Sequence, residues 1–132
     1  DMSDNAMLEE MLKVNPDSLG TSGREAYDEI VDTLYPRMCE DLYETSQANC
    51  EVANYKTGIE NLEKIMLMDE KYAEGGAMLL LASAYEKTGE QDQANLLYQK
   101  ILEELKGTDA AEEAEKALED INKKNAVKSK KT

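Results

Sequence analysis

The segment spanning residues 77–107 constrains the fold most, because its small and large apolar residues recur at the spacings of two short antiparallel helices. Two faces are defined: the first helix presents Ala77, Leu81, Ala82 and Tyr85, and the second presents Ala94, Leu97, Tyr98 and Ile101. Gly89 interrupts the run between them. Small side chains at Ala82 and Ala94 allow the two helix axes to approach closely, and Tyr85 and Tyr98 fill the surrounding space. The sequence therefore predicts a tightly packed helical hairpin.

This hairpin resembles the tetratricopeptide repeat of bacterial type, a helix-turn-helix unit of about 34 residues that stacks into a solenoid. By that resemblance, Gly89 takes the turn glycine of the family and Ala94 its second-helix small position. Two positions depart from the family pattern, since Met78 stands where Trp is preferred and Lys106 where a closing Pro is preferred. The resemblance implies an all-α fold in which about six or seven helices form a right-handed superhelix of antiparallel pairs.

Weaker copies of the pattern predict the organisation of the remaining chain. A shift of 36 residues aligns Gly58 with Ala94 and Ile65 with Ile101, which indicates a preceding, degenerate repeat. Pro36 is expected to end or kink a helix before it. The predicted segments are a half repeat at 1–16, an extra helix at 22–35, a degenerate repeat at 38–72, a well-matched repeat at 75–107 and a capping helix at 108–122. Residues 1–122 thus form one helical repeat domain, and the Lys-rich tail at 123–132 is expected to be disordered.

The charge of the chain argues against nucleic-acid binding. Its net charge is −14, and the tail contributes five lysines and no acid, so the body is more acidic than the whole. An acidic body repels phosphate backbones. The same charge also serves solubility, which is the commoner reason for a solvated acidic surface.

Residues suited to catalysis or metal binding are scarce. The chain has no His and only two cysteines, Cys39 and Cys50, which lie about 16 Å apart if one helix holds both. That separation excludes a disulfide between them, so free and partly buried thiols are expected. No Ser or Cys neighbours a plausible base, and no Gly-rich phosphate loop occurs. We therefore predict a protein that is not an enzyme, with no catalytic residues, no metal and no cofactor.

The cellular location is left open by the sequence. No apolar run approaches the ~18 to 20 residues that a membrane span needs. The chain begins at Asp1 without an initiator Met, so we expect a fragment or processed piece of a longer protein, either cytoplasmic or the extracytoplasmic part of a membrane-anchored protein. An anchor upstream of Asp1 is compatible with this expectation.

Binding is the function that the resemblance implies. In the family, the first helices of successive repeats line a groove for a peptide or protein segment. The corresponding positions here are Glu40, Tyr43, Gln47, Leu79, Ser83 and Glu86. These residues mix apolar and acidic character, which favours a basic or apolar extended segment as partner. Two hypotheses remain: a protein-binding scaffold, and a structural spacer or self-association module of a larger envelope-associated protein.

Overall fold

The computed structural model describes the backbone of residues 2–131 and the side chains of residues 6–125. Within this part of the chain every regular element is a helix, which confirms the all-α prediction. Six α-helices and two short 3-10 helices follow in this order: α1 (Met2–Lys13), η1 (Pro16–Ser18), α2 (Thr21–Glu51), α3 (Tyr55–Met68), η2 (Tyr72–Gly75), α4 (Gly76–Lys87), α5 (Gln91–Glu104) and α6 (Asp109–Lys131).

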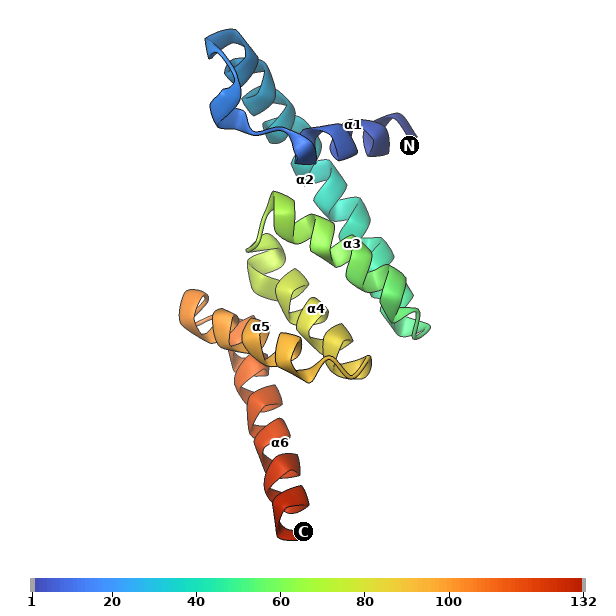
Figure 1. Ribbon diagram of the computed structural model, residues 1–132, viewed down its shortest axis with the longest axis vertical. Coiled ribbons are helices and arrows are strands. Elements are labelled where there is room, and N and C mark those ends of the chain that lie inside the picture. The colour runs from blue at the N-terminus through green and yellow to red at the C-terminus, as the bar shows by residue number, and fades with distance from the viewer. Residues whose placement is uncertain (1, 132) are drawn as a thin grey trace.

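The helices are stacked in chain order. Figure 1 shows them arranged along the long axis of the molecule, with the start of α2 at one end, α1 lying beside α2, and α6 at the other end. Each helix packs chiefly against the helices next to it in sequence, and the pairs α2–α3 and α4–α5 form the most extensive contacts. The core is consequently a row of three apolar clusters rather than one centre, joined by half-buried residues that belong to two clusters at once: Leu42, Met66, Met68, Tyr85 and Leu97.

The hairpin of α4 and α5 has the predicted packing. Ala82 and Ala94 are completely buried, and Tyr98 lies in the core with 2% of its surface exposed. Gly89 takes a φ of 86° in the turn between the helices, a left-handed conformation that glycine adopts without steric cost. The predicted burial of these small residues and of Tyr98 in one apolar cluster is thus confirmed.

The alternative that Pro36 ends a helix is wrong. Residues 22–35 and 38–51 belong to one helix, α2, which continues through Pro36. Proline removes one backbone hydrogen bond from a helix interior. Buried side chains on both sides of it, Leu34 and Tyr35 before and Met38 and Cys39 after, pack against neighbouring elements and hold the helix in register. The expected extra helix is therefore the first half of α2.

The predicted end of the last helix at Lys123 also differs from the structure. The helix α6 extends to Lys131, and only Thr132 of the predicted tail lies outside the described backbone. No Gly or Pro interrupts residues 109–131, and lysines near a helix C-terminus interact favourably with the helix dipole. Both features favour continuation of the helix where disorder was expected.

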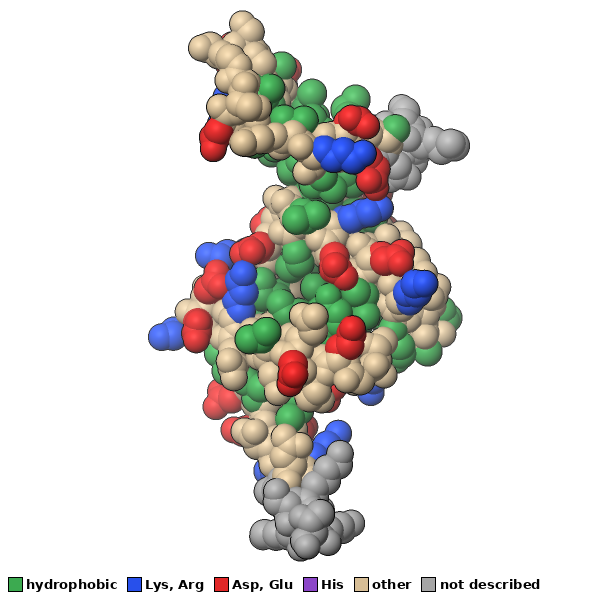
Figure 2. Space-filling model, viewed as in Figure 1, with side chains coloured by type: hydrophobic (Ala, Val, Ile, Leu, Met, Phe, Trp, Pro, Cys, Tyr) green, Lys and Arg blue, Asp and Glu red, His purple; other side chains and the backbone are tan. Residues whose placement is uncertain are grey.

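The N-terminal part, formed by α1, η1 and the first half of α2, joins the body at a narrow region (Figure 2). Leu8 and Met11 of α1 pack there against Leu34, and an ion pair of 3.2 Å links Lys64 of α3 to Glu9 of α1. Lysines and acids are interspersed over the face drawn in Figure 2. None of the described helices combines the length and the apolar character required to span a membrane.

Candidate functional site

A groove lies along α4, between α2 on one side and α6 on the other. One part of it has a volume of about 380 Å³, and its lining is Tyr43, Gln47, Gly76, Leu79, Leu80, Ser83, Tyr98, Glu113 and Ala117. We call this part the apolar compartment. Four of the six residues predicted from the sequence line it, namely Tyr43, Gln47, Leu79 and Ser83. The structure thus brings together residues of two helices that the sequence assigned to one face.

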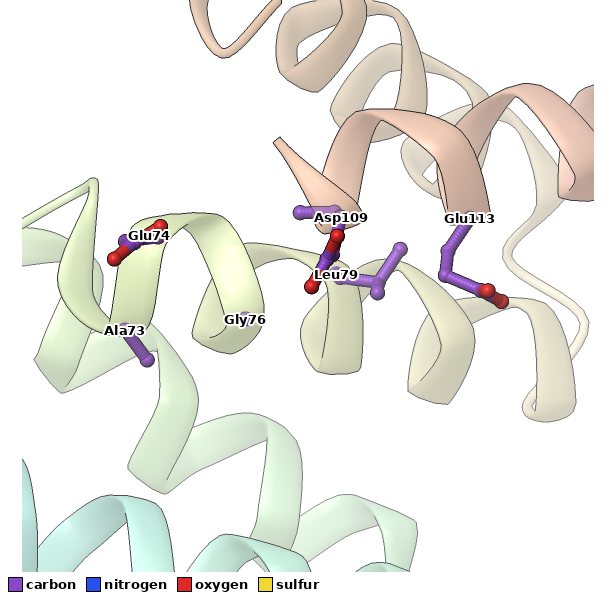
Figure 3. A pocket seen from close by; sticks show the side chains of 7 residues that line it. Ala73, Glu74, Gly76, Leu79, Asp109 and Glu113 are labelled. Atoms are coloured by element: carbon purple, nitrogen blue, oxygen red, sulfur yellow. The ribbon is translucent and has the colours of Figure 1, made fainter. Parts of the chain in front are cut away.

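An acidic compartment adjoins the apolar one. It has a volume of about 470 Å³ and is lined by Ala73, Glu74, Gly76, Leu79, Asp109, Ala110 and Glu113. Gly76, Leu79 and Glu113 line both compartments, so the two are continuous. Figure 3 shows Leu79 between Asp109 and Glu113, with Glu74 near the start of α4. The three carboxylates therefore flank an apolar floor.

The lining residues of α4 and α6 occur in pairs about one repeat length, or about 34 residues, apart. Gly76 corresponds in this way to Ala110, Leu79 to Glu113 and Ser83 to Ala117. Both helices run in the same general direction in Figure 1, and they contact each other directly. The two helices hence contribute residues about 34 positions apart to the same groove.

Tyr43 forms the α2 wall of the apolar compartment. Its ring packs edge to face on the ring of Tyr72, with 5.6 Å between the ring centroids. A Cβ atom at Gly76 would lie 2.8 Å from the Tyr43 hydroxyl oxygen, so the absence of a side chain at Gly76 makes room for the phenol. Glycine at the start of α4 and the aromatic pair together fix the position of this wall.

The connector before α4 has an unusual backbone. Ala73, Glu74 and Gly75 take φ angles of 59°, 54° and 92°, three successive left-handed conformations. For residues other than glycine, this conformation costs about 1–2 kcal/mol each. Gly75 is buried against Leu105 and Ala110, which anchor the connector to the turn between α5 and α6. This packing holds Ala73 and Glu74 at the edge of the acidic compartment despite the strain.

The other two predicted residues, Glu40 and Glu86, do not line the groove. Glu86 accepts a hydrogen bond of 2.9 Å from the Tyr98 hydroxyl, and burial together with this hydrogen bond raises the pKa of Tyr98. Glu40 is exposed on α2. Its charge adds to the effect of burial in raising the pKa of Tyr72. Glu86 thus joins the two helices of a hairpin, and neither residue reaches the compartments.

The sequence reasoning missed Glu74, Asp109 and Glu113. The last helix was treated as a cap with one face that lacked a neighbour, so its acids were assigned to solvent. Extending the repeat spacing from Leu79 and Ser83 into that helix would have identified Glu113 and Ala117. The signal was present, but it required the capping helix to be read as the first helix of another repeat.

Among residues 6–125 no group of three His, Cys, Asp or Glu side chains is arranged to hold a metal ion. Cys39 and Cys50 are free thiols, as predicted, and Cys39 is buried. Burial, with a smaller effect from Asp69, raises the pKa of Cys39 to about 11, and burial also raises the pKa of Cys50. Both thiols are therefore protonated and weakly nucleophilic at neutral pH.

Comparison with known proteins adds no family: no family model, curated protein or solved structure matches the chain. The resemblance to the tetratricopeptide repeat accordingly stays a prediction from the residues. What the protein does must be argued from the groove.

Proposed function

We propose that the protein is a non-catalytic scaffold that binds a peptide or protein segment in the groove along α4. The observation that carries this proposal is the convergence of Tyr43 and Gln47 from α2 with Leu79 and Ser83 from α4 around one hollow. Concave sites with an apolar floor and a few polar groups are where proteins bind ligands. The volumes of the two compartments, about 380 and 470 Å³, suit several side chains of an extended segment.

A tetratricopeptide-like solenoid is the architecture that we propose for this scaffold. It is supported by the stacking of helices in chain order, by the linear series of apolar clusters, and by paired lining positions about 34 residues apart. In this reading α2, α4 and α6 are the first helices of successive repeats. The right-handed twist is part of the proposal and follows from the family resemblance.

Selection of peptides from a random phage-displayed library on the immobilised protein tests the binding function. We expect enriched peptides to lose binding to Leu79→Glu, because a carboxylate in the apolar floor disfavours an apolar ligand side chain. Leu67→Glu is the matched control, since Leu67 is 71% exposed on α3 and lines neither compartment. Circular dichroism must show that both variants are folded.

Leu79 also packs against the core, so a second variant protects the test from misfolding. Ser83→Tyr fills the apolar compartment with a bulky side chain and should block the same peptides. The scaffold proposal is wrong if the library yields no enriched peptide, or if the peptides bind all three variants as tightly as the unmodified protein. A spacer or self-association module would give the first result.

A further inference from the structure

We infer that the groove recognises a segment with two neighbouring features, an apolar side chain and a lysine or arginine about two residues from it. This inference rests on the proposed binding function and specifies the partner of the same site. The occupant is a basic and apolar protein segment. An acidic segment or a purely apolar one would leave half of the groove without a complementary group.

The groove carries a concentration of negative charge. Glu74, Asp109 and Glu113 line the acidic compartment, whereas no lysine or arginine lines either compartment. One exposed ion pair, of 3.7 Å between Lys116 and Glu113, compensates part of this charge, and its side chains are 70% and 59% exposed. Exposed pairs of this kind are weak and exchange readily with another cation. The compartment is thus complementary to a positively charged side chain.

The acidic and apolar compartments lie directly beside each other. Leu79 and Glu113 line both, so a side chain above Leu80 and Tyr43 has the acidic compartment as its immediate neighbour. An extended chain advances about 3.3 Å per residue and turns alternate side chains to the same side. A segment lying along α4 can therefore place an apolar side chain in one compartment and a cation two residues away in the other.

The backbone that carries the three acids is fixed by the fold. Glu74 is held at the groove by the left-handed connector that Gly75 anchors against Leu105. Asp109 and Glu113 are four residues apart on α6, which puts both carboxylates on the same side of that helix. The fold thus fixes where the three acids begin, whereas their side chains are exposed, so their main effect is on specificity.

A charge-reversal selection with the same random peptide library tests the inference. The unmodified protein should enrich peptides with an apolar residue close to Lys or Arg. The variant Glu74→Lys/Glu113→Lys should instead enrich Asp or Glu beside the apolar residue. It should also bind the original peptides about tenfold or more weakly, because two attractive charges become repulsive.

The matched control is Glu103→Lys/Glu119→Lys, which changes the net charge equally at exposed positions outside both compartments. It should retain the preference for Lys or Arg. The inference is overturned if peptides that depend on Leu79 show no enrichment of Lys or Arg, or if the control loses the preference as fully as the groove variant does. Either result leaves the binding function intact, whereas a library that enriches nothing overturns both.

Discussion

Replacement of Gly75 by alanine should lower the free energy of unfolding by about 2–5 kcal/mol, because the added methyl group meets two separate obstacles. The φ of Gly75 is 92°, a left-handed conformation that costs a residue with a side chain about 1–2 kcal/mol. A Cβ atom there would also lie 2.5 Å from Cδ1 of Leu105 and 3.1 Å from Cβ of Ala110. Relieving such overpacking typically costs a further amount of about 1–3 kcal/mol.

Gly89→Ala separates the two contributions. The φ of Gly89 is 86°, almost the same as at Gly75, but no atom lies within 4 Å of the position that a Cβ would occupy. This variant should therefore lose only the conformational part, about 1–2 kcal/mol. Urea unfolding followed by circular dichroism gives both free energies, and their difference measures the packing of the connector against the turn between α5 and α6. Equal losses in the two variants would refute that packing.

Three further predictions concern stability. Pro36→Ala should raise the melting temperature, because it restores a hydrogen bond inside α2, where proline costs about 3 kcal/mol; a lower melting temperature would contradict this. Tyr98→Phe should lower the free energy of urea unfolding by about 2 kcal/mol, since Glu86 loses its hydrogen-bond donor; an unchanged value would contradict it. Burial raises the pKa of Cys39 to about 11 and that of Tyr85 to about 12, so their contribution to stability is complete below pH 9 and is lost as the pH rises through these values. The urea midpoint should accordingly fall as the pH rises from about 9 to about 12, and a constant midpoint would show that neither group contributes.

The helices from α3 to α6 were predictable because their determinants are local. Apolar residues at helical spacing, with glycines at 89 and 107 in the turns, predicted a repeat from residue 75 and a capping helix from residue 108, and α4 and α6 begin one residue after these positions. Thr108, the first residue of the predicted capping helix, caps α6, because its hydroxyl oxygen accepts a hydrogen bond of 3.2 Å from the backbone N–H of Ala111. Signals of this kind act within a few residues, so the sequence alone is sufficient to interpret them.

The course of α2 could not be predicted in the same way. The local signal at Pro36 is a helix break, whereas the outcome depends on burial of Tyr35 and Met38 against residues such as Leu8 of α1. That contact joins segments about 30 residues apart in sequence, and its stabilisation outweighs the local cost of proline. The position of Glu86 also depends on a contact between two helices, because its hydrogen bond with the Tyr98 hydroxyl of α5 holds it away from the groove.

The groove itself depends on relations between hairpins rather than within them. Its walls come from α2, α4 and α6, which are not consecutive, so the angle between successive hairpins decides whether Tyr43, Leu79 and Glu113 surround one hollow. The connector from Ala73 to Gly75 sets the angle between the hairpins on either side of it, and it does so with a backbone conformation that residues with side chains avoid. Since Gly75 fixes this connector and Glu74 belongs to the acidic compartment, a substitution that relaxes the connector should alter stability and partner preference together.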